Sequence, residues 1–237
     1  MTNCIITGVG GQGVILMSRL IGTAAAAKGL DVKGAETIGM AQRGGSVVSH
    51  IRIGDGAKSP LVARGTADVL IALEPSEAVR ALRYLRDGGM AFVSNRAISP
   101  RKENFDVGNA SAHNRTDCPR NETFDGDEVF AANREVLSRK ENFSAAERKI
   151  SEETTAVASQ TDTAIGYLRR AVKNLRVVDY ESVVSRCGAK AFNTALLGIA
   201  VSSGAFPFGK DDVRGALIGR ISEKFLEINL NALACEN

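Results

Sequence analysis

A glycine-rich turn near the N-terminus constrains this chain more than any other feature. The run Gly8-Val9-Gly10-Gly11-Gln12-Gly13 follows an apolar stretch, residues 4–7, and precedes a segment of helical character, residues 14–28. It matches the pattern G-x-G-x-x-G, in which glycines let the backbone turn sharply from a strand into a helix and approach a pyrophosphate. The helix N-terminus would aim unpaired N–H groups at an anion. The sequence therefore predicts a strand–turn–helix unit in which phosphate binding is physically available.

Two further features bear on a nucleotide. Glu36 lies about twenty residues beyond Gly13, at the end of the next predicted strand, where a dinucleotide-binding fold places its ribose-binding carboxylate. A second glycine-rich turn then contains Gln42-Arg43-Gly44-Gly45. The guanidinium of Arg43 could grip a phosphate or carboxylate in fork geometry, or form a salt bridge to a partner. Both glycine runs could instead serve turn geometry and close helix–strand contact.

Strand and helix signals alternate along most of the chain. Strands are predicted at 31–36, 47–53, 67–73, 90–94 and 175–179, and the Asp-Gly pair of Gly54-Asp55-Gly56 predicts a hairpin from 47–53 to 60–63. Ser76 is expected to cap a helix through residue 86, and further helices are predicted at 180–186, 189–204, 211–221 and 222–234. This alternation predicts a three-layer αβα, Rossmann-like α/β fold with a mostly parallel sheet and a β-hairpin.

The segment from about 95 to 165 differs from the rest. It is polar, dense in mixed charge and poor in aliphatic residues, and Arg-Lys-Glu-Asn-Phe occurs in it twice, at 101–105 and 139–143. It is expected to be a surface insertion, helical in part, within a single domain covering residues 1–237. The repeat is too short to indicate a repeat architecture.

Charge and composition narrow the classes of function. A net charge of +3 is too small to indicate nucleic-acid or membrane binding, and no apolar run approaches the length of a membrane span. The chain begins without the form of a signal peptide, so a cytoplasmic location is expected. The four cysteines, Cys4, Cys118, Cys187 and Cys235, never form a C-x-x-C pair, which predicts reduced thiols and no zinc or iron–sulfur site.

Other candidate residues favour structural roles. His50 lies within a predicted strand, where it could line a site near Arg43, but a structural role is favoured. Gly54-Asp55-Gly56 has the opening of the thiamine diphosphate and magnesium motif, in which a later Asn completes the metal site. No Asn follows before Asn95, so the hairpin interpretation is preferred.

Several of these segments together resemble a known family. They resemble the gamma subunit or domain of 2-oxoacid:ferredoxin oxidoreductases, and among these the small (beta) subunit of the indolepyruvate enzymes. The resemblance covers roughly residues 1–95 and 175–237 and is specific because the glycine loop and Q-R-G-G occur in order. The segments on which the resemblance rests are Gly8-Val9-Gly10-Gly11-Gln12-Gly13-Val14, Gly34-Ala35-Glu36, Ala41-Gln42-Arg43-Gly44-Gly45, Ala67-Asp68-Val69-Leu70-Ile71-Ala72-Leu73-Glu74-Pro75, Lys190-Ala191-Phe192-Asn193-Thr194-Ala195-Leu196-Leu197-Gly198 and Phe225-Leu226-Glu227-Ile228-Asn229.

The resemblance implies a division of labour between subunits. Thiamine diphosphate, magnesium and iron–sulfur clusters are expected in a large partner subunit, with coenzyme A as co-substrate and ferredoxin as the eventual acceptor. This chain would bind no cofactor, be inactive alone, and either pack on the large subunit or form a homodimer when isolated. Its candidate interface or substrate-approach residues are Gly8, Gly10, Gly11, Gln12, Gly13, Glu36, Gln42, Arg43, Gly44 and Gly45.

Two alternatives belong to other classes. The first is a free-standing NAD(P)- or flavin-dependent dehydrogenase that uses Gly8, Gly10, Gly13 and Glu36. The second is a purely structural interaction domain. The absence of any independent cofactor chemistry favours the subunit interpretation, and the glycine loop is then expected to carry no nucleotide.

Overall fold

The structure, a computed structural model, describes residues 1–39, 45–98 and 157–235. Its six-stranded sheet has the order β2-β3-β1-β4-β5-β6. The strands are β1 (Thr2–Val9), β2 (Val32–Ile38), β3 (Ser46–Ile53), β4 (Ala67–Ala72), β5 (Leu85–Ser94) and β6 (Asn174–Val178). Most of the polar insertion predicted at 95–165 lies outside the described residues, so its structure and the single-domain division stay predictions.

The sheet is mostly parallel, as predicted. β1, β4, β5 and β6 pair in parallel, whereas β3 lies antiparallel between β1 and β2. The predicted hairpin was misplaced, because it joins β2 to β3 rather than flanking Gly54-Asp55-Gly56. Residues 60–63 form no strand: the N–H of Val62 donates to Nδ1 of His50 at 3.2 Å, so this segment is held to the sheet by a side chain instead of a ladder.

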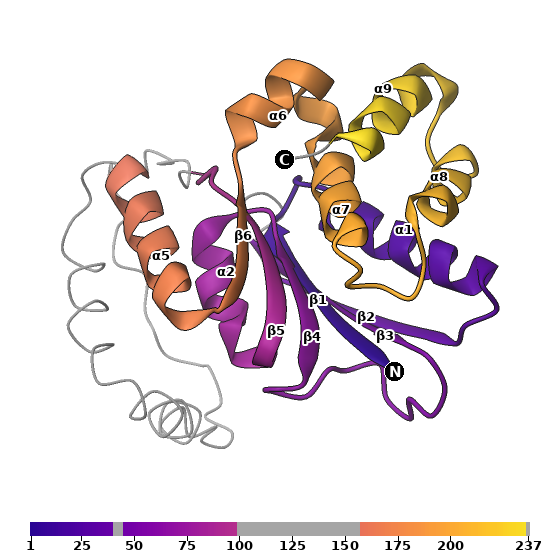
Figure 1. Ribbon diagram of the computed structural model, residues 1–237, viewed down its shortest axis with the longest axis horizontal. Coiled ribbons are helices and arrows are strands. Elements are labelled where there is room, and N and C mark those ends of the chain that lie inside the picture. Colours follow the sequence, from indigo (N-terminus) through magenta and orange to yellow (C-terminus); the bar gives the residue numbers. More distant parts are fainter. Residues whose placement is uncertain (40–44, 99–156, 236–237) are drawn as a thin grey trace, which may run out of the picture. The chain divides into compact units, whose positions relative to one another are not determined.

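Helices cover both faces of the sheet (Figure 1). One face carries α1 (Val14–Ala27), α7 (Phe192–Ser202), α8 (Lys210–Ile218) and α9 (Glu223–Ala234). The other carries α2 (Pro75–Ala81) and α5 (Val157–Ala171). Each side chain of a strand alternates between faces, so neighbouring Ile5 and Ile6 enter the two separate hydrophobic clusters. The predicted three-layer αβα fold is confirmed.

Helix α7 is the most buried element on its face. Nine of its eleven residues, from Phe192 to Val201 except Asn193, are buried, in agreement with its apolar sequence. Its Gly198 approaches α9 so closely that a Cβ there would lie 2.5 Å from the carbonyl oxygen of Leu233. The backbones of two helices meet at this point because glycine has no side chain.

The segment after β4 differs from the sequence prediction. Glu74, not Ser76, caps α2, since its carboxylate accepts the backbone N–H of Glu77 at 2.8 Å. Pro75 then occupies the first turn, where its missing N–H costs nothing. The helix ends at Ala81 and β5 begins at Leu85, five residues earlier than predicted. In the part of the chain that the structure describes, no helix is both long and apolar enough to cross a membrane.

Candidate functional site

The glycine loop lies at the point where the sheet connections diverge. β1 and β4 are parallel neighbours, and the chain leaves β1 through α1 on one face and β4 through α2 on the other. Ligands of open α/β sheets bind in the crevice at such a point, outside the carboxyl ends of the strands. Because β3 runs antiparallel, its first residue, Ser46, and the preceding Gly45 reach the same edge. The structure therefore brings together the loop 8–13, Gly45 and the residues that follow β4.

The side chain of Gln12 occupies this crevice. Its Oε1 accepts the backbone N–H of Val9 at 2.8 Å, and its Nε2 donates to the carbonyl of Leu73 at 2.9 Å. The N–H of Gly10 donates to the carbonyl of Gly45 at 2.8 Å. Two loop amides of the kind that would bind a pyrophosphate are thus bonded within the protein. A phosphate could reach them only by displacing these bonds.

Two of the loop glycines have backbone conformations that require glycine. Gly11 and Gly13 adopt φ values of 97° and 86°, in the left-handed region. Gly11 is exposed and nothing surrounds the position of a Cβ there, whereas a Cβ at Gly13 would collide with Nδ2 of Asn193. Asn193 stands at the start of α7, so a residue 180 positions away covers the N-terminus of α1. No local signal singles out Asn193 as part of this site.

Glu36 lies apart from the loop. It is exposed on the edge strand β2, where it pairs with Ser49, and Ser49 in turn pairs with Ile6 in the interior of β1. Two strand spacings, roughly 9–10 Å, therefore separate Glu36 from β1. In a dinucleotide-binding fold the second strand is the direct neighbour of the first. Here β3 lies between β1 and β2, so β2 is not the direct neighbour of β1. The dehydrogenase alternative is therefore not favoured.

Three of the candidates, Gln42, Arg43 and Gly44, lie outside the described residues. Among the described residues, two buried carboxyl groups that sequence reasoning missed lie near the start of β3 and α2. Glu77 is 3% exposed and accepts the Ser46 hydroxyl at 2.5 Å and Nη1 of Arg80 at 2.5 Å. Glu74 is 5% exposed, and burial raises the pKa of its carboxyl group. Glu77 thus ties the start of β3 to α2, and Glu74 caps the start of the same helix.

A second polar cluster joins the ends of β5 and β6. The Asn95 amide donates to Oδ1 of Asp179 at 2.8 Å and accepts the N–H of Tyr180 at 2.8 Å. Arg96 donates to the Tyr180 hydroxyl and stacks over the Tyr180 ring, with its guanidinium carbon 4.2 Å from the centroid. This cluster fixes the start of α6 (Tyr180–Cys187), and sequence reasoning had assigned these residues no role.

His50 has the structural role favoured from the sequence. Its ring is 5% exposed, accepts the Val62 N–H and packs edge-on against Tyr84 at 5.1 Å. Burial and, to a lesser degree, the charge of Arg83 lower its pKa, so the neutral imidazole that accepts this hydrogen bond is stabilised.

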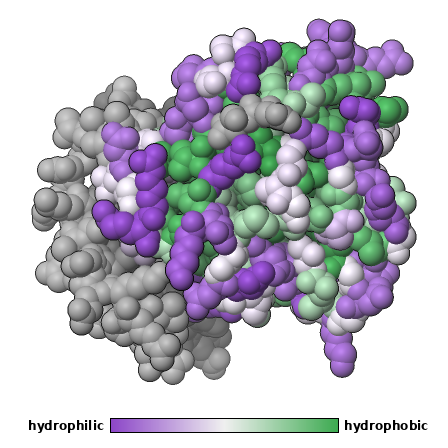
Figure 2. Space-filling model, viewed as in Figure 1, coloured by the Kyte–Doolittle hydropathy of each residue, from purple (hydrophilic) through white to green (hydrophobic). Residues whose placement is uncertain are grey.

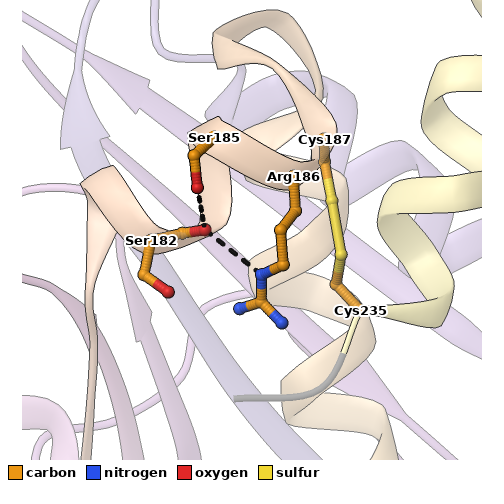
Figure 3. The surroundings of a disulfide bond; sticks show 5 residues. All are labelled: Ser182, Ser185, Arg186, Cys187 and Cys235. Carbon is orange, nitrogen blue, oxygen red and sulfur yellow. Dashed lines mark hydrogen bonds between the residues drawn. A yellow bond between two sulfur atoms is a disulfide. The ribbon is translucent and has the colours of Figure 1, made fainter.

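The expectation of reduced cysteines was wrong for two of the four. Cys187 at the end of α6 and Cys235 after α9 form a disulfide across 48 residues (Figure 3). The packing of two helices distant in sequence brings the thiols together, which spacing along the chain does not reveal. Cys4 is free and buried, and burial raises the pKa of its thiol. Among the described residues, no group of three or more His, Cys, Asp or Glu side chains could hold a metal ion.

Comparisons with known proteins agree with this architecture. The sequence matches the family described as pyruvate ferredoxin/flavodoxin oxidoreductase over residues 3–235. It is 32% identical over 232 residues to indolepyruvate oxidoreductase subunit IorB of Archaeoglobus fulgidus, covering 98% of this chain and 91% of that protein.

Two solved structures share the fold. One is the gamma subunit of a keto/oxoacid ferredoxin oxidoreductase from Geobacter sulfurreducens, with a TM-score of 0.54, 18% identity and coverage of 98% of this chain and 94% of that one. The other is 2-oxoglutarate:ferredoxin oxidoreductase from Magnetococcus marinus, with 2-oxoglutarate, coenzyme A and succinyl-CoA bound. Its TM-score is 0.55 at 14% identity, and the match covers 98% of this chain and 29% of that one. Since the family match and the Archaeoglobus relative both span nearly the whole chain, this protein belongs to the pyruvate ferredoxin/flavodoxin oxidoreductase family, whose members are oxidoreductases.

Proposed function

We propose that this chain is the accessory subunit of an oxidoreductase that decarboxylates a 2-oxoacid, with an aryl pyruvate such as indolepyruvate as substrate, ferredoxin as electron acceptor and coenzyme A as acyl acceptor. The observation that carries the proposal is its 32% identity, over nearly its full length, to a protein named as an indolepyruvate oxidoreductase subunit. The bonds that engage Gln12 and Gly10 also support it, because a subunit that holds no nucleotide needs no free amides in its glycine loop.

The Gly54-Asp55-Gly56 turn does not fit thiamine diphosphate. Asp55 is exposed on the turn after β3, at the edge of the sheet opposite the glycine loop, and no Asn follows it at the spacing of the thiamine motif. We therefore assign thiamine diphosphate, magnesium and the iron–sulfur clusters to a larger partner subunit. This chain would then supply the shape and the electric charge of a surface that faces the partner's reaction site.

We infer that the carboxyl edge of the sheet is this surface. Gly11 is exposed there with open space around its Cα, so another backbone could approach it closely. Gln42, Arg43 and Gly44 belong to the segment between β2 and β3, and the residue that follows them, Gly45, bonds to the glycine loop. Arg43 is the candidate for binding a carboxylate or phosphate of substrate or coenzyme A. Ser46, held by Glu77, anchors the far end of that segment.

Co-expression with a larger subunit that carries the thiamine motif and clustered cysteines tests the proposal. We expect the two chains to co-purify and the complex to reduce ferredoxin with a 2-oxoacid, while the isolated chain is inactive. Arg43→Ala should lower the rate of the complex about tenfold or more without dissociating it. The matched control, Arg64→Ala, changes an exposed arginine in the loop before β4 and should leave the rate unchanged.

Three outcomes would contradict the proposal or its parts. Oxidation of a 2-oxoacid by the isolated chain would show a free-standing enzyme. Failure of the chains to associate would remove the subunit role. Full activity of the Arg43→Ala complex would favour a structural interaction domain without a part in the substrate approach.

A further inference from the structure

A pocket lies on the helical face of the molecule. Its volume is about 330 Å³, at the small end of the range for small-molecule sites, which is roughly 300–1,000 Å³. It is lined by residues from α1, from the short helix η2 (Ala189–Ala191) and from α9 with the turn before it. These residues are Leu16, Lys190, Arg220, Ile221, Ser222, Phe225 and Asn229.

The lining is apolar with a buried amide. Leu16, Ile221 and Phe225 supply the apolar walls, and each is partly buried. Asn229 is 4% exposed; its Oδ1 accepts the Thr194 hydroxyl at 2.6 Å and its Nδ2 donates to the Phe225 carbonyl at 2.8 Å. These bonds fix the amide and leave one Nδ2 proton for a ligand. Figure 2 shows hydrophobic residues at the surface near α9, bordered by hydrophilic ones.

Two cations border this apolar surface without an acidic partner. Lys190 places its ammonium 5.0 Å from the centroid of Phe225. Arg220 donates its Nε proton to the Thr23 hydroxyl at 2.9 Å, which orients the guanidinium and leaves its two terminal amino groups available. Neither residue forms a salt bridge within the part of the chain that the structure describes, and the pocket lining contains no carboxylate.

We propose that this pocket binds a small organic anion with a flat apolar body, such as an aryl-substituted carboxylate. The carboxylate would bridge Lys190 and Arg220, and the ring would pack on Phe225 and Leu16. Such a ligand supplies the charge that the two cations lack and covers apolar surface that inorganic anions would leave in water. The proposal goes beyond the proposed function, because the site is built by this chain alone and needs no partner subunit.

Calorimetric titration of the full-length chain with 3-phenylpropionate tests the proposal. We expect saturable binding at one site. Lys190→Gln and Arg220→Gln should each weaken it about tenfold, since each removes a charge-assisted bond to the carboxylate. Neutral 3-phenylpropanamide and inorganic phosphate should bind at least about tenfold more weakly than 3-phenylpropionate, because each lacks one of the two recognised features.

Two control variants separate the pocket from general surface charge. Lys224 also lies over the Phe225 ring, at 5.8 Å, but does not line the pocket, and Arg214 is an exposed arginine of α8 paired with Asp211 at 3.2 Å. Lys224→Gln and Arg214→Gln should leave the affinity within about twofold. All four variants change exposed side chains, and thermal unfolding confirms that each is folded.

The proposal is overturned by any of three results. These are no binding of 3-phenylpropionate at millimolar concentration, equal binding of the neutral amide or of phosphate, and equal weakening by the control variants. None of these measurements depends on the large subunit. Failure of the ligand site and failure of the subunit role are therefore distinguishable.

Discussion

At the scale of single residues, Gly11 and Gly13 differ in what surrounds them rather than in conformation. Gly11 and Gly13 both have left-handed φ values, of 97° and 86°. Only Gly13 faces a neighbour, the amide of Asn193, whose Oδ1 also accepts the Thr194 N–H at 2.9 Å. The sequence pattern does not distinguish the two glycines, because Asn193, which meets Gly13, comes from the C-terminal half of the chain.

This difference predicts unequal costs of substitution. Gly11→Ala should lower the free energy of unfolding by about 1–2 kcal/mol, the cost of a left-handed non-glycine residue. Gly13→Ala should cost about 1–3 kcal/mol more, because its Cβ also overlaps the Asn193 amide. Urea denaturation measures both values.

A double-mutant cycle identifies the cause. Adding Asn193→Ala should recover about 0.5 kcal/mol or more in the Gly13→Ala background and nothing in the Gly11→Ala background. Equal costs for the two glycine substitutions would show that Asn193 moves aside freely.

The buried carboxyl group of Glu74 predicts a dependence of stability on pH. Burial, which favours the neutral acid, raises its pKa above the usual value of 4.5. The folded protein therefore holds this proton to higher pH than the unfolded chain does, and stability falls as pH rises from the unfolded through the folded pKa. In the Glu74→Gln variant, the amide oxygen can still accept the Glu77 N–H, and no buried charge forms.

The expected result is a stability difference that changes with pH. Relative to the unsubstituted protein, Glu74→Gln should gain unfolding free energy as pH rises from about 4 to about 7. Urea denaturation at a series of pH values measures this difference. Glu227→Gln, at an exposed position of α9, should show no comparable trend. A Glu74→Gln difference that stays constant across the series would contradict the role assigned to burial.

At the scale of elements, the disulfide links two helices that are far apart in the sequence, α6 and α9. It joins the end of α6 to the residue after α9, and α9 packs on α7 through the Gly198 contact. Closing a loop of 48 residues stabilises the folded state by about 4 kcal/mol in the chain-entropy account, and measured values are commonly about 2–4 kcal/mol. The stability of α9 is therefore coupled to the redox state of Cys187 and Cys235.

We expect Cys235→Ser to lower the free energy of unfolding by about 2–4 kcal/mol under oxidising conditions. A reductant should destabilise the unsubstituted protein by a similar amount and should have no effect on the variant, which serves as its own control. Denaturant titrations with and without reductant provide the comparison. Equal stability of the two proteins without reductant would show that the link contributes nothing.

The order of the strands determines whether the glycine-rich turn at residues 8–13 belongs to a dinucleotide site. The pattern G-x-G-x-x-G and the later Glu36 satisfied a dinucleotide site in spacing alone. The antiparallel β3 displaces β2 to the edge of the sheet, and Gln12 bonds the amide of Val9 and the carbonyl of Leu73. The local glycine pattern predicts the turn, whereas the ligand that the turn could bind depends on which strand lies beside β1.

At the scale of the whole molecule, we therefore predict that the isolated chain binds neither NADH nor NADPH. Titration of either nucleotide, followed by calorimetry, should give no saturable heat at concentrations of about 1 mM. The matched variant Glu36→Ala should behave identically, since this carboxylate lies two strands away from β1. Micromolar binding that Glu36→Ala abolishes would restore the dehydrogenase alternative.

Much of the fold was predictable from local patterns. The alternation of apolar runs with helical segments gave the αβα layers, because each element carries its own periodicity. The positions of β4, α6, α7, α8 and α9 agree with prediction to within a few residues. The misplaced hairpin reflects a contact between separate segments, the His50 bond to Val62, whereas the wrong cap is a local error, because Glu74 and not Ser76 accepts the Glu77 N–H.

The sequence by itself determined the class of fold, the strand–turn–helix unit at Gly8–Gly13 and the family resemblance, since all of these rest on residues close together in the chain. Only the tertiary structure decided the direction of β3, the filling of the crevice by Gln12, the disulfide and the pocket between Lys190 and Arg220. Each of these joins residues that are far apart in sequence, and their meeting depends on how whole elements pack rather than on any local preference.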